Sequence, residues 1–306
     1  MISARAWFTR DGVRALRPLG IALAWIVLYV VVGAAVAFVL TKGYTLMARH
    51  SVLVLADVTS PWFLPVFATL LLIGFGAATW LIGVRLGRYS WAELGWPAAG
   101  GPESGALPAL VRGFAIGTLV AALAIALNVV LGGTRVQVVP HWSAYVGAAA
   151  PLVLGLLGAA LFEELVFRGF PLRRLADALG AWPATLLLAA AFGLMHIPND
   201  HASGFGIVNV ALAGVWLSIA FFSPGGIALG WGLHFGWNLG LALLGAPVSG
   251  MRFGPPQAVY QPGPHAWFDG GAFGPEGGLV GTIAIATGAA AILGSRVRRP
   301  SLWVAA

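Results

Sequence analysis

The sequence contains no cysteine and few charged residues. Without cysteine the chain can form no disulfide framework, no thiolate metal site and no cysteine nucleophile. Charged residues make up only 9% of the 306 residues, whereas a soluble domain carries about 25%. A chain so poor in charge cannot cover a globule with polar surface, and 59% of its residues are hydrophobic. The composition therefore predicts a protein immersed in a lipid bilayer.

The apolar residues are gathered into eight segments that are long enough, or nearly long enough, to span a bilayer. A helix needs roughly 20 apolar residues to cross the hydrocarbon core. The sequence therefore predicts an all-α polytopic membrane protein of about eight transmembrane helices, folded as a single membrane domain over residues 1–306. The Gly/Pro-rich stretch 245–278 is expected to be a loop lying on the surface. The predicted spans are 18–41, 62–84, 113–132, 143–168, 182–198, 204–222, 226–244 and 279–295.

Basic residues are distributed unevenly between the two ends of these segments. With the N-terminus in the cytoplasm, 13 of the 17 Lys and Arg residues fall on the cytoplasmic side, and only Lys42, Arg49, Arg135 and Arg252 fall outside. Cytoplasmic loops of membrane proteins carry such an excess. We therefore expect a multi-pass protein of the cell (plasma or inner) membrane with both termini cytoplasmic. Orientation in the membrane also explains the net charge of +7, so no nucleic-acid partner is required.

Two adjacent acids lie inside an apolar segment, where burying a charge is costly and usually marks function. Glu164 and Arg168 are four residues apart and share one helix face. Arg168 can therefore neutralise Glu164, whereas Glu163 lies about 100° around the helix. This leaves Glu163 free to face a cavity and to act as a general base. The alternative is that both acids only bond Arg168 and lock helix packing, although one arginine does not need two acids.

Two histidines and an asparagine are further polar groups within the apolar segments. His234 and Asn238 are four residues apart and point the same way from their helix, while His196 lies near the end of its span. A lone membrane histidine is often only an interhelical hydrogen bonder. Together with an unpaired glutamate, these residues supply a base for water, an imidazole to position it and donors for an oxyanion. The sequence therefore predicts a catalytic core within about 143–245, with a buried polar site between the fourth, fifth and seventh predicted spans.

Three motifs in this region resemble those of the CAAX protease and bacteriocin-processing (CPBP) family, also called type II CAAX prenyl endopeptidases or Abi proteins. The motifs are Glu163-Glu164-x-x-x-Arg168, Phe192-x-x-x-His196 and His234-x-x-x-Asn238. Each motif alone is weak, but all three in order on membrane helices are a strong match. The resemblance implies an α-helical intramembrane protease.

The resemblance also implies a role for each motif residue. Glu163 would activate water together with His196. His234 and Asn238 would form the oxyanion site. Glu164 would complete the catalytic set. Two residues, Arg168 and Phe192, would support its geometry.

A metal-dependent reading of the same residues stays open, since the family has also been described as metalloproteases. Glu163, His196 and His234 would supply one oxygen and two nitrogen ligands, the number found at a catalytic zinc site. However, the sequence has no HExxH run with its built-in base. If Glu163 bound zinc, a second base would be needed, and Glu164 is tied to Arg168. We therefore favour a mechanism without metal or other cofactor, which uses each residue once.

Two functions of other classes compete with peptidase activity. A non-catalytic membrane scaffold or immunity-type protein could keep the fold, but it need not keep all four residues Glu163, His196, His234 and Asn238. A transporter could use buried Glu and His to relay protons, but the internal repeats that would favour one are not evident. The expected partners are the lipid bilayer and a peptide or lipopeptide substrate, either prenylated CAAX-type or another membrane-associated peptide.

Overall fold

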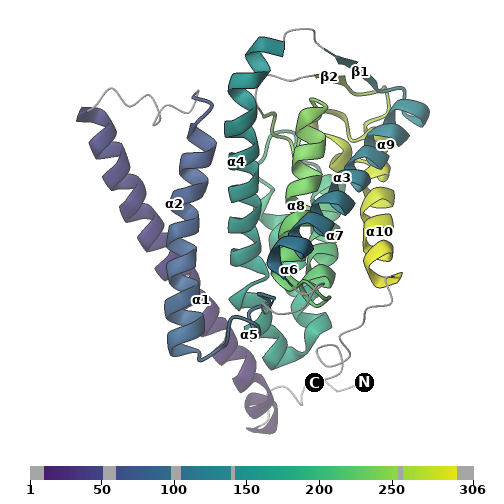
Figure 1. Ribbon diagram of the computed structural model, residues 1–306. Helices are drawn as coiled ribbons and strands as arrows, with labels where there is room; N and C mark the ends of the chain where they lie inside the picture. Colours follow the sequence, from purple (N-terminus) through teal and green to yellow (C-terminus); the bar gives the residue numbers. More distant parts are fainter. Residues whose placement is uncertain (1–9, 51–59, 98–104, 139–141, 254–257, 295–306) are drawn as a thin grey trace.

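The protein is a bundle of helices, seen in a computed structural model that describes residues 10–50, 60–97, 105–138, 142–253 and 258–294 (Figure 1). Backbone polar groups must be satisfied internally in a bilayer, and long apolar segments achieve this as helices. The helices are α1 (Arg10–His50), α2 (Phe63–Ala78), its π-helical continuation η3 (Thr79–Leu86), α3 (Ala106–Leu131), α4 (Trp142–Phe167), α5 (Phe170–Leu179), α6 (Ala181–Met195), α7 (Gly204–Phe221), α8 (Gly226–Leu243), α9 (Ala266–Asp269) and α10 (Leu279–Gly294).

Several of these helices have the length and composition of membrane spans. Within the described residues, five stretches are long and apolar enough: Arg17–Met47, Phe63–Leu86, Ala106–Leu131, Ala149–Leu179 and Gly204–Phe221. Two further apolar helices, α6 and α10, are shorter. Apolar side chains such as those of Val39, Leu119 and Val130 lie exposed on helix surfaces, where lipid would surround them. The expected all-α polytopic membrane protein is confirmed, while the count of eight spans stays a prediction.

The helices are arranged so that α1 and α2 stand at one side of the bundle, next to α4 (Figure 1). The main core lies on the other side of α4, where α3, α7, α8 and α10 pack together. Helix α5 lies at one end of the bundle, and α9 lies at the other end with the two short strands (Figure 1). These strands, β1 (Arg135–Val138) and β2 (Ala258–Gln261), pair antiparallel with Arg135 opposite Gln261.

Helices α3 and α8 pack with their backbones in close contact because glycines line both helices. A Cβ added to Gly113 or Gly117 would overlap carbonyl oxygens of α8, and a Cβ on Gly232 or Gly236 would overlap carbonyl oxygens of α3. Small residues four apart allow this approach in membrane helices, where packing rather than the hydrophobic effect drives association. On the other side of α8, the indole of Trp231 donates a 2.8 Å hydrogen bond to the carbonyl of Leu157 on α4. These contacts fix the position of α8, which carries two of the predicted site residues.

Two regions differ from the sequence-based expectation. The connection after the fourth predicted span contains the helix α5, which buries Leu172 and Leu175 and exposes a polar face. The stretch 245–278, expected to be a surface loop, contains β2, α9 and the 3-10 turns η4 (Gly271–Phe273) and η5 (Pro275–Gly277). Many of its described residues are buried, including Asp269 and Glu276. The surface-loop expectation was therefore wrong for this part of the chain, because glycine-rich backbone here packs directly against neighbouring segments.

Candidate active site

The predicted site residues of three helices meet at one cavity of about 230 Å³. Glu163 comes from α4, His196 directly follows α6, and His234 and Asn238 come from α8. All four residues line the cavity, together with Phe192 on α6. Apolar side chains of α2, including Leu64 and Phe67, line another part of its wall. The structure therefore brings together residues that are far apart in the sequence.

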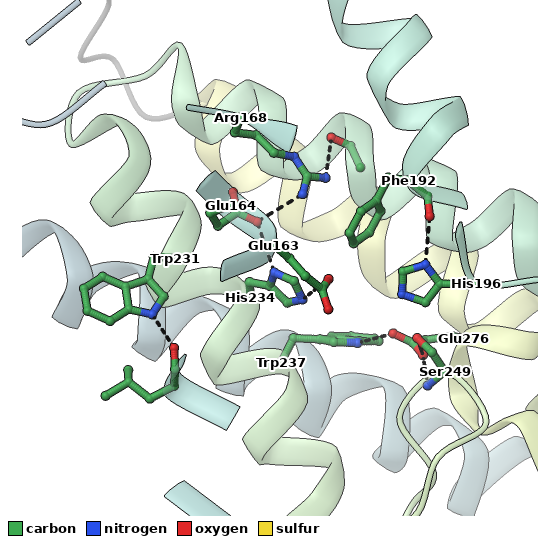
Figure 2. A network of polar contacts seen from close by, with 12 residues as sticks. Glu163, Glu164, Arg168, Phe192, His196, Trp231, His234, Trp237, Ser249 and Glu276 are labelled. Atoms are coloured by element: carbon green, nitrogen blue, oxygen red, sulfur yellow. Dashed lines mark hydrogen bonds and ion pairs between the residues drawn. The ribbon is translucent and has the colours of Figure 1, made fainter. Parts of the chain in front are cut away.

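Glu164 lies behind the cavity and holds two other site residues in place (Figure 2). Its Oε1 accepts hydrogen bonds from Nη1 of Arg168 at 3.1 Å and from Nδ1 of His234 at 3.0 Å. Glu164 and Arg168 are fully buried, with 0% and 1% of their side chains exposed. The expected i, i+4 pair is confirmed. Because Nδ1 of His234 bonds this carboxylate, the opposite nitrogen of the ring is directed elsewhere.

That opposite nitrogen faces Glu163. Nε2 of His234 lies 3.6 Å from Oε2 of Glu163, and the Glu163 side chain is 24% exposed while that of His234 is 8% exposed. Within the described part of the chain, Oε2 of Glu163 has no hydrogen-bond partner. The two adjacent acids therefore have different surroundings, as expected: Glu164 is buried against Arg168, and Glu163 reaches the cavity.

His196 is oriented by the backbone of the last turn of α6. Its Nδ1 lies 2.7 Å from the carbonyl oxygen of Phe192. A carbonyl can only accept a hydrogen bond, so Nδ1 carries the proton, and Nε2 of the neutral ring keeps a free lone pair. The hydrogen bond thus selects one tautomer of His196.

The ring of Phe192 explains why an aromatic residue stands in the second motif. It packs edge-on against His196 at 4.8 Å and against His234 at 6.0 Å between ring centroids. The guanidinium carbon of Arg168 lies 4.3 Å from the centre of the same ring. A cation over an aromatic face is attracted electrostatically. Phe192 therefore lies between the two imidazoles and contacts the buried cation.

Sequence reasoning missed a second polar group on the cavity wall. Trp237, Ser249 and Glu276 line the cavity, and Glu276 hydrogen-bonds both of the others (Figure 2). Ser249 and Glu276 fall within the stretch that was expected to lie on the surface, so neither was considered as a buried group. One sequence feature could have indicated this group: Glu276 is an acid in a stretch that has no Lys or Arg between Arg252 and Arg296.

The cavity residues do not form a metal site in this arrangement. Among the described residues, no group of three or more His, Cys, Asp or Glu side chains is gathered closely enough to hold a metal ion. In this arrangement Glu163, His196 and His234 are not gathered as the three ligands of one metal ion. Glu164 cannot replace a ligand readily, since its Oε1 is already bonded to Arg168 and His234.

The fold and the cavity together define a helical membrane protein with a buried carboxylate and imidazole site. Residues 145–240 match the model of the Rce1-like family, described as type II CAAX prenyl endopeptidase Rce1-like. The matched segment contains all three motifs and spans about a third of the chain, and it confirms the resemblance seen in the sequence. No curated protein and no solved structure matches the chain. Over this segment the chain is similar to type II CAAX prenyl endopeptidases.

Proposed function

We propose that this protein is an intramembrane endopeptidase that hydrolyses peptide bonds in prenylated CAAX-type or other membrane-associated peptides, with water activated by Glu163. One observation carries the proposal. Glu163 and the Nε2 edge of His234 face the same cavity, while Glu164 anchors His234 and Arg168 from behind. A peptide carbonyl placed in this cavity would meet a base on one side and hydrogen-bond donors on the other.

Glu163 is the base in the proposed reaction. Its carboxylate takes a proton from water as the water oxygen attacks the carbonyl carbon of the substrate, giving a tetrahedral intermediate with a negatively charged oxygen. The C–N bond then breaks, and the proton held by Glu163 passes to the leaving nitrogen. Positioned acid–base groups of this kind contribute about 10²–10⁴-fold in rate. His196 assists by holding the attacking water through the lone pair of Nε2.

His234 and Asn238 stabilise the negative oxygen. Glu163, Glu164 and Arg168 together leave one net negative charge, which a protonated His234 cancels. Its Nδ1–H then bonds Glu164, and its Nε2–H is available at the cavity. The amide of Asn238 has two further donors, and it lies one helical turn from His234 on the same face of α8. Donors aimed at the developing charge stabilise the transition state more than the bound substrate.

The proposal is tested with protein purified into nanodiscs and incubated with peptide and prenylated lipopeptide libraries in H₂¹⁸O. Mass spectrometry should show cleavage, with one ¹⁸O atom in each new carboxyl group. Most activity should survive EDTA or phenanthroline. Complete loss with a chelator, restored by stoichiometric zinc, would instead make Glu163, His196 and His234 metal ligands. No cleavage of any library member would favour a membrane scaffold over a peptidase.

A further inference from the structure

Glu276 is a buried acid in the cavity wall that the proposed reaction does not use. Only 5% of the residue is exposed. Its Oε1 accepts a 2.7 Å hydrogen bond from the indole of Trp237 on α8. Its Oε2 accepts one from the backbone N–H of Ser249 and another, at 2.8 Å, from the Ser249 hydroxyl. Burying a carboxyl group is unfavourable unless such bonds replace water, and here three donors from two segments converge on it.

The segment that Glu276 binds is a tight turn with unusual backbone geometry. Val248 and Met251 exchange backbone hydrogen bonds of 2.8 and 2.9 Å around Ser249 and Gly250. Both central residues have positive φ, +46° for Ser249 and +86° for Gly250, as in a type I′ turn. Asn, Asp and Gly are the residues that usually adopt this conformation. Serine is less suited to it, so the hydrogen bonds that Ser249 donates to Glu276 help to hold Ser249 there.

The turn touches the surroundings of two catalytic motifs. The carbonyl of Ser249 accepts a 2.8 Å hydrogen bond from the amide of Asn199, three residues after His196. On its other side the turn is bonded through Glu276 to Trp237, the neighbour of Asn238 in sequence. The side chains of Val248 and Met251 line the cavity itself. The turn therefore connects the His196 end of α6 with the wall formed by α8.

We propose that Glu276 is a positioning residue that clamps the Val248–Met251 turn, and that this turn is the wall against which the substrate backbone is aligned between His196 and Asn238. The role rests on the proposed peptidase function. Glu276 does not itself react, because both of its oxygens are engaged by Trp237 and Ser249. Glu163 and His234 are held separately, through Glu164. Loosening the turn should therefore weaken substrate binding more than the chemical step.

Substitutions at Ser249 separate the clamp from general folding. Ser249→Asn places a residue favoured at positive φ, and its amide can donate to Glu276, so its KM should rise much less than that of Ser249→Asp. In Ser249→Asp the aspartate has nearly the same shape as asparagine, but it presents a second carboxylate to Glu276. It should raise KM about ten-fold, in the range expected for lost pocket contacts, with a smaller fall in kcat. Glu276→Gln should also raise KM, because the amide N–H groups of glutamine would face a hydrogen-bond donor where the carboxylate accepted one.

A double variant supplies the sharpest control. In Ser249→Asp combined with Glu276→Gln, the new amide can donate to the new carboxylate while its oxygen still accepts from Trp237. KM should therefore return toward the wild-type value. A purely structural role predicts additive damage instead. Wild-type KM in Ser249→Asp, or a double variant worse than both single variants, would overturn the clamp.

Hydrogen exchange without substrate tests the clamp independently of peptidase activity. Amides of Val248, Gly250 and Met251 donate backbone hydrogen bonds, and they should be protected in the wild type and in Ser249→Asn. In Ser249→Asp, protection should fall at these amides and at residues 199–202, but not in α3 or α8. Unchanged exchange, or exchange raised equally throughout the bundle, would overturn the proposal. A wild type that cleaves no peptide would overturn the proposed function alone, since the exchange pattern still decides whether the clamp exists.

Discussion

At the scale of single residues, the site depends on the different surroundings of two adjacent carboxylates. Glu164 is fully buried, and its Oε1 is shared by Arg168 and His234. Glu163 is partly exposed to the cavity and is not part of that ion pair. Glycine at position 230 makes room for this arrangement, because a Cβ there would lie 3.1 Å from Oε2 of Glu164. One acid therefore maintains the structure, and the other is available for chemistry.

Glu164→Gln should lower stability and activity together. The amide keeps the shape but removes the counter-charge of buried Arg168, and breaking a buried ion pair typically costs about 3–5 kcal/mol. Chemical unfolding in detergent measures the loss. Asp177→Asn is a matched control, since Arg173 and Asp177 form a 3.0 Å i, i+4 pair that is partly exposed and should contribute only about 0–1 kcal/mol. Equal stability of Glu164→Gln and wild type would show that the buried pair is not needed for folding.

Asn238→Ala should reduce kcat by about 10²–10³-fold, the usual cost of losing one oxyanion donor, with little change in KM. Asn238→Asp should be worse than Ala, because a carboxylate would repel the negative oxygen of the intermediate. Steady-state kinetics on one cleaved peptide compare the two variants. An Asn238→Asp enzyme with the wild-type kcat would rule out the oxyanion role and leave Asn238 as a packing residue.

At the scale of helices, the site depends on how closely α3 and α8 approach. Glycines remove the side chains that would separate the two backbones, so α8 reaches the position in which His234 meets Glu164. The face of α8 that contacts α3 lies opposite the face that carries Trp231, and Trp231 bonds α4. Helix packing and catalytic geometry are therefore coupled through α8.

Gly113→Ala should destabilise the bundle, because its Cβ would overlap the backbone of α8 at Leu229. Overpacking of this kind typically costs about 1–3 kcal/mol. Gly76→Ala on α2 is the matched control, since a Cβ there meets nothing within 4 Å and alanine favours a helix over glycine by up to ~1 kcal/mol. Thermal unfolding in one detergent compares the variants. A Gly113→Ala protein as stable as Gly76→Ala would mean that the helices can move apart without cost.

The sequence predicted these helices and most of the site for simple physical reasons. Apolar length alone located α4, α8 and α2 with its continuation η3 to within a few residues, because a bilayer leaves few other structures possible. Residues such as Glu163 and His234 stood out because charge and hydrogen-bonding groups are rare in apolar segments. Helix α5 was not predicted because it is short and amphipathic, whereas the membrane spans were predicted from long apolar runs. Glu276 was missed because its burial depends on contacts with α8 and the Val248–Met251 turn, which no local pattern records.

At the scale of the whole molecule, the two ends of the bundle differ in character. Helix α5, with Arg173 and Arg174, lies at the end opposite to α9 (Figure 1). In the predicted orientation α5 is cytoplasmic and the α9 end is outside, and this orientation stays a prediction. Arg10, Arg14 and Arg17, which also enter this prediction, lie in the first turns of α1, whereas Arg5, Arg296, Arg298 and Arg299 lie outside the described residues.

Reporter fusions test the orientation. A reporter at the C-terminus should be active in the cytoplasm, and one inserted beside exposed Trp267 should be active on the opposite side. Paired reporters that work in only one compartment each, such as a phosphatase and a fluorescent protein, give complementary readings. Fusions that report the same compartment at both positions would contradict the eight-span arrangement with both termini cytoplasmic.

The central claim is that Glu163 is the base of an intramembrane peptidase, and the turnover of Glu163→Gln tests it most directly. Glutamine keeps the shape and lies outside the Glu164–Arg168 pair, so the variant should unfold like the wild type. Glu93→Gln, an exposed acid bonded locally to Ser90, serves as the control and should remain fully active. With the peptide that the wild type cleaves, Glu163→Gln should lose about 10²–10⁴-fold in kcat, the contribution of a general base. A folded Glu163→Gln protein that cleaves this peptide at the wild-type rate would contradict the account.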